Sequence, residues 1–404
     1  MRLVLFFLLL SFSLFTKSQN IENFYSADGL VSDFITCIDT DNSGNIWIGT
    51  NNGVSYFDGI SFTNYNVSDG IIDNNILSIK CGINNEVYVG TNFGLSVYNG
   101  SNWLSYDILS GLSDNKIVNI DINQSGDIWC SHANFSSGVS VFNGTSWSVI
   151  NPGNFILSCD FDDLENAWFA SLLDGVIVES ANNNFSNINT NNSNLISNGI
   201  TDILIDQYNR KWIGTNSGLS VFDNNNNFIE NHTIMYSLPP PDTLNPVVEI
   251  DIDSWNRIWV AIYVGYLAQG GVAFYNGSIW QDFDISDGVA GPNVTCLKVD
   301  YNNNVWVGTS TGLSKIIPLP SNSLIFEQNK KLKVFPNPAK DYAIIHSSTN
   351  QKLFITDLYG KKVSSQIDKF SSYSKINTRS LSSGVYFINL IENHQRTVHR
   401  LIVN

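Results

Sequence analysis

Short runs of alternating hydrophobic and polar residues follow one another along most of the chain, and turn residues separate them. In the first stretch the runs are 34–39, 45–50, 54–57 and 62–65. The segments between them read Asp-Asn-Ser-Gly, Asn-Asn-Gly and Asp-Gly. Gly and Asn tolerate the positive φ of tight hairpin turns, so the pattern predicts four short antiparallel strands.

This four-strand unit recurs along the chain, and each copy carries an aromatic residue in its second strand. Consecutive aromatic residues are 39 to 47 positions apart. They are Trp47, Tyr88, Trp129, Trp168, Trp212, Trp259 and Trp306. Seven such units at this spacing are typical of a β-propeller, with one unit per blade. The sequence therefore predicts an all-β fold with a seven-bladed β-propeller over residues 19–317.

The last unit ends after Gly312-Leu-Ser-Lys-Ile316 and lacks a fourth strand. The segment before the first unit, 21–25, aligns with the fourth strand of the first unit when it is shifted by one repeat. We therefore expect the N-terminal strand to complete the last blade, which would close the ring and leave no open strand edge.

The repeat resembles the two-component-regulator propeller repeat, whose pattern is D-x-x-G-x-I-W-I-G-T-x-x-G-L-S-x-Y-D-G. The segments Asn45-Ile-Trp-Ile-Gly-Thr50 and Asn304-Val-Trp-Val-Gly-Thr309 carry the match most clearly. In bacterial hybrid sensors this repeat forms the ligand-sensing part outside the cytoplasm. No kinase or DNA-binding segment is visible here, which favours a free-standing recognition module.

Residues 1–18 have the pattern of a secretory signal peptide. Arg2 precedes an apolar stretch over 3–15, and a cleavage site is plausible before Gln19. The apolar stretch is short for a bilayer span, and no later segment reaches spanning length, so we expect no transmembrane segment after cleavage.

The composition changes after a linker over 318–329, and residues 330–404 predict a small immunoglobulin-like β-sandwich. This segment resembles the C-terminal sorting domain of type IX secretion in Bacteroidetes. The matching residues are Pro336, Asn337, Pro338, Asp357, Gly360, Lys361, Leu381, Gly384, Tyr386 and Arg400. The resemblance implies contact with the type IX secretion machinery, export across the outer membrane, and a location in the medium or on the cell surface. An ordinary accessory β-sandwich is the alternative.

The two parts of the chain differ in charge. Residues 21–320 contain 7 basic and 31 acidic side chains, a net charge of −24, whereas residues 321–404 contain 12 basic and 5 acidic ones, a net charge of +7. An acidic propeller repels nucleic acids and anionic membranes, and we therefore expect neither as a partner.

Five cysteines occur, and four of them lie at similar positions in the repeat: Cys37, Cys81, Cys159 and Cys296. Cys130 is the fifth. This regularity predicts buried free thiols. A disulfide is conceivable only between Cys37 and Cys296, on the blades that meet at the ring closure.

Catalytic and metal-binding motifs are not recognisable. The propeller has two histidines about one hundred positions apart, His132 and His232, and no metalloprotease, nucleophile-elbow or phosphate-loop pattern. Asp39, Asp41 and Ser43 resemble the opening of a calcium loop, but the bidentate acid is missing, so we interpret them as turn residues. We expect no metal and no cofactor.

The connections between strands suggest where a ligand binds. In a blade with strands A to D running outward, the D–A and B–C connections share one face, the loop face, and the A–B and C–D turns share the other, the turn face. The longest connections, 237–246, 263–270 and 131–137, all belong to the loop face. The candidate ligand contacts there are Tyr263, Tyr266, His132, Phe135 and Phe93. We expect the turn face to have few aromatic residues and little concavity.

These features predict a secreted or surface recognition module that binds a glycan, a peptide or a surface protein through the loop face. A propeller hydrolase or lyase acting on polysaccharide or peptide is the alternative, because abundant carboxylates allow an acid–base pair. A purely structural surface protein is a third hypothesis.

Overall fold

The computed structural model describes residues 20–180, 182–236, 245–263, 270–318, 339–346, 352–357, 361–369, 373–392 and 395–403. They divide into two compact units, Met1–Pro318 and Leu319–Asn404. The predicted signal peptide lies outside the described residues. No described helix is long and apolar enough to span a membrane.

The first unit is a β-propeller, and its described residues form seven four-stranded antiparallel sheets. The first blade contains β2 (Ile35–Thr40), β3 (Ile46–Thr50), β4 (Gly53–Phe57) and β5 (Phe62–Tyr65). The second contains β6 (Ile76–Cys81), β7 (Val87–Thr91), β8 (Leu95–Tyr98) and β9 (Trp103–Tyr106). The third contains β10 (Asn119–Ile122), β11 (Ile128–Ser131), β12 (Val139–Phe142) and β13 (Trp147–Ile150).

The fourth blade contains β14 (Ile156–Phe161), β15 (Ala167–Ser171), β16 (Gly175–Glu179) and β17 (Phe185–Ile188). The fifth contains β18 (Ile200–Ile205), β19 (Lys211–Thr215), β20 (Gly218–Phe222) and β21 (Phe228–His232). The sixth contains β22 (Val247–Ile252), β23 (Ile258–Ile262), β24 (Gly271–Tyr275) and β25 (Trp280–Phe283). The seventh contains β26 (Val294–Val299), β27 (Val305–Thr309), β28 (Gly312–Ile317) and, as its outer strand, β1 (Asn20–Phe24). Short 3₁₀ turns at Ser26–Asp28, Val67–Asp69 and Ile108–Ser110 follow β1, β5 and β9.

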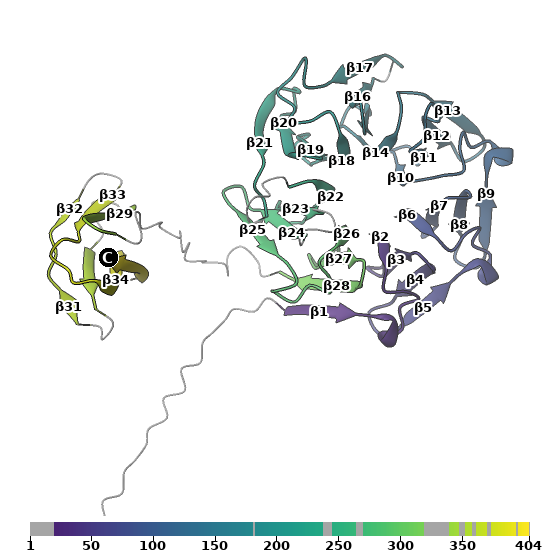
Figure 1. The fold of residues 1–404 in the computed structure, drawn as a ribbon. Coiled ribbons are helices and arrows are strands. Elements are labelled where there is room, and N and C mark those ends of the chain that lie inside the picture. The colour runs from purple at the N-terminus through teal and green to yellow at the C-terminus, as the bar shows by residue number, and fades with distance from the viewer. Residues whose placement is uncertain are drawn as a thin grey trace, which may run out of the picture. The chain divides into compact units, whose positions relative to one another are not determined.

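The blades form a closed ring with the inner strands of neighbouring blades in contact (Figure 1). The N-terminal strand completes the seventh blade, as predicted, because β1 pairs antiparallel with β28 from Asn20 and Ile317 to Phe24 and Leu313. β2 of the first blade in turn contacts β26 of the seventh. The two ends of the propeller sequence therefore meet in one sheet.

The repeated tryptophans lie between blades. Trp47, Trp212 and Trp306 are each at least 96% buried. Trp47 packs with residues of the second blade such as Ile76 and Ile79, and Trp306 packs with residues of the first blade. These contacts join each blade to the next and form the core of the ring.

In five blades, an aspartate six positions before the repeated tryptophan accepts a hydrogen bond from its indole. The indole Nε1–H donates to this carboxylate at 2.9–3.0 Å in four of them and at 3.4 Å in the first. The pairs are Asp41–Trp47, Asp162–Trp168, Asp206–Trp212, Asp253–Trp259 and Asp300–Trp306. The other carboxylate oxygen accepts backbone N–H groups of the A–B turn, as Asp41 does from Ser43 and Asn45. The calcium-like sequence at Asp41 is therefore a turn that bonds its own backbone, as interpreted.

Two separate contacts explain why glycine and threonine occur in the Gly-Thr pair that follows the aromatic residue. A Cβ on Gly49 would lie 2.7 Å from Cγ2 of Ile76 in the next blade, so only glycine permits this approach. The hydroxyl of Thr50 donates to the carbonyl of Gly53 at 2.8 Å and closes the B–C turn.

All five cysteines are free thiols. Cys130, Cys159 and Cys296 are buried, whereas Cys37 and Cys81 are partly buried. Desolvation raises the pKa of the Cys37 thiol to about 12. Cys37 and Cys296 are not bridged.

The second unit has two small antiparallel sheets in its described residues. One contains β29 (Tyr342–His346), β33 (Tyr373–Asn377) and β32 (Ile367–Lys369). The other contains β31 (Lys362–Val363), β30 (Lys352–Thr356), β34 (Gly384–Glu392) and β35 (Gln395–Val403). Residues of both sheets share one core, among them Ile345, Ile376 and Ile388.

The sorting-motif residues lie in different parts of this unit. Pro336, Asn337, Pro338 and Gly360 are outside the described residues. Tyr386 belongs to the core, and its hydroxyl donates to the carbonyl of Ser382 at 2.8 Å. Lys361 closes a turn by donating its backbone N–H to Asp357 at 2.9 Å, and Gly384 begins β34.

Candidate functional site

The longest fully described B–C connection lies on the third blade, where residues 132–138 separate β11 from β12. His132 anchors it from inside: its side chain is fully buried, and its ring nitrogens lie 2.9 Å from the carbonyl oxygen of Lys116 and 2.8 Å from Oγ of Ser140. Burial lowers the pKa of His132. A buried ring with both nitrogens engaged has no surface for a ligand, so His132 positions the loop and does not form a direct contact.

The carboxylate of Asp114 ties the same loop to the preceding D–A connection. It accepts hydrogen bonds from Nδ2 of Asn134 at 2.7 Å and from Oγ of Ser137 at 2.9 Å. Burial opposes ionisation, but these bonds and one from the backbone of Lys116 lower the pKa of Asp114. The loop is therefore held by a charged acceptor rather than by apolar packing alone.

Phe135 is the exposed tip of this loop, with 69% of its surface accessible. Its ring packs edge-on against Phe155 of the next D–A connection, with centroids 5.2 Å apart. Ser136 and Phe155 adopt positive φ angles of 59° and 51°, a conformation that residues other than glycine seldom adopt. Non-glycine backbone of this kind often occurs at functional sites.

Exposed apolar side chains occupy the B–C connections of the two neighbouring blades as well. Phe93 on the second blade is 61% exposed, and its backbone N–H donates to the hydroxyl of Thr91 at 3.0 Å. Leu173 on the fourth blade is also exposed. We call Phe93, Phe135 and Leu173 the loop-face patch. Two of the predicted contact residues therefore lie on adjacent blades of one face.

The other predicted contacts are placed differently. Tyr263 is partly buried just after β23, and its backbone N–H donates to the carbonyl of Pro246 at 3.3 Å. Tyr266 and residues 237–244 lie outside the described residues, so the long connections of the sixth blade stay a prediction.

The expectation for the turn face is wrong. Exposed or partly exposed ring side chains occupy the A–B turns of three successive blades: Tyr208, Trp255 and Tyr301. The aspartate at the start of each turn accepts backbone hydrogen bonds, and an asparagine near its end adopts the positive φ that the turn requires, as Asn209 and Asn256 do. The remaining turn positions carry no conformational demand and can therefore accept large side chains.

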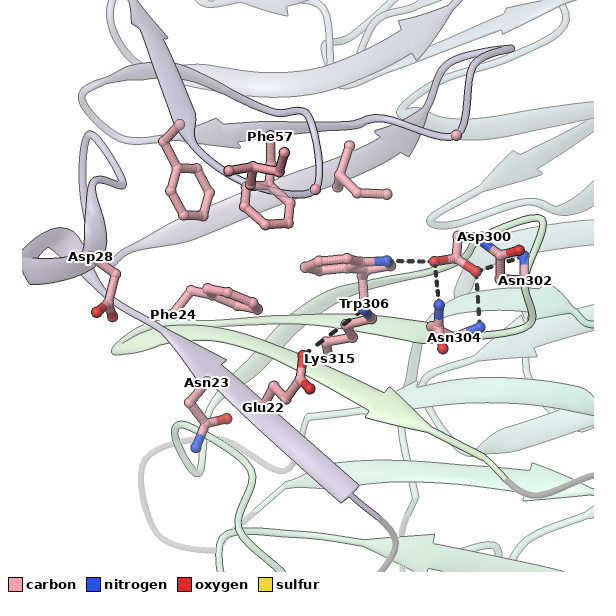
Figure 2. A pocket seen from close by; sticks show the side chains of 15 residues that line it. Glu22, Asn23, Phe24, Asp28, Phe57, Asp300, Asn302, Asn304, Trp306 and Lys315 are labelled. Atoms are coloured by element: carbon pink, nitrogen blue, oxygen red, sulfur yellow. Dashed lines mark hydrogen bonds and ion pairs between the residues drawn. The ribbon is translucent and has the colours of Figure 1, made fainter.

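The turn face also has a pocket of about 490 Å³ at the seam between the seventh and first blades (Figure 2). Its apolar floor consists of ring side chains: Phe24 lies 5.7 Å from Trp306 and 5.3 Å from Phe57, measured between centroids. Its polar walls are Glu22, Asn23, Asp28, Asp300, Asn302, Asn304 and Lys315. We call it the seam pocket.

Lys315 distinguishes this seam from the others. It pairs with Trp306 in the register of the blade, a position that Tyr56, Val97, Val141, Val178, Val221 and Phe274 occupy in the other blades. Its Nζ lies 5.4 Å from the Trp306 ring centroid and 3.9 Å from the carboxylate of Glu22. This site was not predicted from the sequence, although a charged residue at an otherwise apolar repeat position could have indicated it.

The seven inner strands line a central channel of about 220 Å³ that contains carboxylates. Burial raises the pKa of Asp202 to about 6, and burial together with the charge of Asp202 raises that of Glu249 to about 8. Asp202 accepts from the backbone N–H of Ile250, and Glu249 from that of Leu297, each at 2.8 Å on the next blade. These carboxylates connect blades. Among the described residues, no group of three or more histidine, cysteine or acidic side chains is placed to hold a metal ion.

Comparison with known families agrees with this architecture. Residues 333–404 match the secretion system C-terminal sorting domain, and residues 29–52 and 288–311 match the two component regulator propeller. No curated protein matches the chain. The sorting domain indicates secretion or attachment to the outer surface.

Solved structures of similar fold include one from B. thetaiotaomicron and one from Porphyromonas gingivalis. The extracellular domain of the hybrid two component system BT3049 from B. thetaiotaomicron is 17% identical, with a TM-score of 0.63, covering 95% of this chain and 54% of that one. PorZ, a surface component of the type-IX secretion system of Porphyromonas gingivalis, is 17% identical, with a TM-score of 0.54, covering 93% of this chain and 60% of PorZ. The chain thus spans less than two thirds of either protein.

Streptogramin B lyase is also similar in fold. It is 12% identical, with a TM-score of 0.58, and the match covers 74% of this chain and 97% of the lyase. At these identities the similarity shows the fold alone. The chain is a propeller protein that carries a sorting domain for the outside of the cell.

Proposed function

We propose that this exported propeller is an extracellular recognition module that binds a polypeptide through the loop-face patch. The observation that carries the proposal is Phe135, a large apolar ring held out to solvent by a loop that buried polar contacts fix in place. Covering such a side chain with a partner is favourable because apolar surface leaves water, and fixing the side chain beforehand reduces the entropy lost on binding.

The side chains of the patch favour a polypeptide over a sugar. Phe93, Phe135 and Leu173 offer apolar surface and no hydroxyl or amide group, which suits apolar side chains of a partner. The propeller segment carries a net charge of −24, and a neutral or basic partner is therefore favoured over an acidic one.

A peptide-display selection against the mature full-length protein tests the proposal. We expect selected peptides to be rich in apolar residues and to bind the Phe93→Ala/Phe135→Ala variant at least about tenfold more weakly, as for central interface residues. The matched control is Leu104→Ala/Val149→Ala, which removes exposed apolar side chains from β9 and β13 of the same two blades. Equal binding by the wild-type protein and the Phe93→Ala/Phe135→Ala variant would refute the proposed site.

A further inference from the structure

Ring side chains line the turn face from the fifth to the seventh blade. Tyr208 and Trp255 hold the same position in successive A–B turns, and Tyr301 follows in the next turn, one position earlier. Tyr208 is 58% exposed and Tyr301 is 65% exposed. The turns touch one another: Gln207 bonds to Asn256, and the backbone N–H of Ser254 donates to Asn303 at 2.8 Å. The three rings therefore lie on consecutive, directly connected turns.

An arginine from the same turn supports each of the first two rings. The guanidinium carbon of Arg210 lies 5.4 Å from the Tyr208 centroid and 5.2 Å from that of Trp212. The guanidinium carbon of Arg257 lies 4.4 Å from the Trp255 centroid. Asp206 and Asp253 hold these guanidinium groups by ion pairs. The supported ring of Tyr208 is exposed and that of Trp255 is partly exposed, so both can serve as stacking platforms.

The row of rings ends at the seam pocket. Tyr301 lies between Asp300 and Asn302, which both line the pocket. The pocket combines acceptors, such as the carboxylates of Glu22 and Asp28, with a donor, the ammonium group of Lys315, and ring side chains including Phe24, Phe57 and Trp306 (Figure 2). Both kinds of polar group and an apolar floor occur together within about 490 Å³, the size of a small-molecule site.

We propose that Tyr208, Trp255, Tyr301 and the seam pocket form a binding track for a neutral oligosaccharide, with a terminal sugar in the pocket. Sugar rings present C–H faces that stack on aromatic rings, and their hydroxyl groups both donate and accept hydrogen bonds. The acidic propeller disfavours sulfated or carboxylated chains. This site lies on the face opposite to the loop-face patch and does not depend on the function proposed above.

Titration of the mature full-length protein with defined hexamers tests the proposal. The probes are cellohexaose, maltohexaose and mannohexaose, with a heparin-derived hexasaccharide and decaproline as comparators, and the readouts are calorimetry and tryptophan fluorescence. We expect at least one neutral hexamer to bind. Its dissociation constant should rise about tenfold in Tyr208→Ala/Tyr301→Ala, the combined effect of two lost stacking contacts.

A second variant tests the pocket separately. Lys315→Val introduces the residue type that four other blades have at this position, so the fold should tolerate it, and we expect binding of the neutral hexamer to weaken several-fold. The matched control, Ile83→Ala/Leu164→Ala, removes exposed residues from A–B turns outside the track and should leave the affinity unchanged. The proposal is overturned if no neutral hexamer binds, if only decaproline or the heparin fragment binds, or if Tyr208→Ala/Tyr301→Ala binds like the wild type.

Discussion

The third blade has an unpaired indole that a two-residue exchange should repair. In this blade the residue six positions before Trp129 is Asn123, and Asp127 follows in the same turn. Oδ1 of Asn123 accepts the backbone N–H of Asp127 at 2.8 Å, and its Nδ2 donates to Oδ2 of Asp127 at 3.2 Å. The amide nitrogen thus occupies the place where other blades have a carboxylate oxygen. The Nε1–H of Trp129, a residue 92% buried, has no partner among the described residues.

We predict that Asn123→Asp/Asp127→Asn stabilises the protein by about 1–2 kcal/mol, because it gives a buried donor a charged acceptor. Both substitutions are needed, since Asn123→Asp alone would place a second carboxylate against that of Asp127. The reverse change in the seventh blade, Asp300→Asn, should destabilise by about 1–3 kcal/mol, because the carboxylate oxygen that Trp306 and Asn304 bond at 3.0 and 2.8 Å becomes a donor.

Urea unfolding followed by circular dichroism measures both effects, with the slope of the transition compared between variants. A higher midpoint for the double exchange and a lower one for Asp300→Asn, at unchanged slope, would support the reasoning. If the double exchange is neutral or destabilising while Asp300→Asn behaves as expected, the repair predicted for the third blade is wrong. If Asp300→Asn leaves the midpoint unchanged, the role given to the repeated aspartate is wrong.

Three further predictions follow from the ring, the channel and the tail. Deleting residues 20–25 should lower the melting temperature markedly, because β28 loses its partner strand and Phe24 its packing on Trp306; an unchanged value would contradict closure by β1. Stability should fall as the pH rises from about 5 to about 9, because folding raises the pKa of Asp202 to about 6 and that of Glu249 to about 8, so the folded state holds these protons more tightly than the unfolded chain. In Asp202→Asn/Glu249→Gln the pH profile measured by thermal unfolding should flatten, and a wild-type profile that rises over this range would oppose the assignment. Removing residues 330–404 should leave a folded propeller in the periplasm, as fractionation and immunoblotting would show, whereas normal amounts in the medium would count against the sorting role.

The ring could be predicted from the sequence because every blade repeats the same pattern. Alternation gave the strands, and the positions of Trp47 to Trp306 gave the register between blades. The match of 21–25 with the fourth strand of the first unit predicted that β1 closes the ring. Each of these inferences uses the sequence repeat. A sequence repeat predicts a structural repeat because equivalent residues pack against equivalent neighbours in each blade.

Single side chains in irregular connections were less predictable. The loop after β11 was correctly assigned to a long exposed connection, and Phe135 does extend into solvent. His132 lies three positions earlier and points inward, because the carbonyl of Lys116 and the hydroxyl of Ser140 offer it two partners in the core. No periodicity encodes that direction, so its burial was visible only in the structure.

The expectation that the turn face has few aromatic residues was wrong because it was based only on the residues that form the turn backbone. Asp, Asn and Gly mark tight turns and say nothing about the residues between them, where Tyr208, Trp255 and Tyr301 are found. Lys315 is a different case. It departs from an apolar position in six other blades, so an alignment of the repeats with each other would have revealed it.

The central claim, that a partner binds the loop face, is tested most directly by hydrogen–deuterium exchange of the mature protein with and without a peptide selected by display. The account predicts that the peptide slows exchange at residues 91–94 and 132–138 and leaves the A–B turns unaffected. Protection confined to the A–B turns, or no protection at saturating peptide, would contradict it.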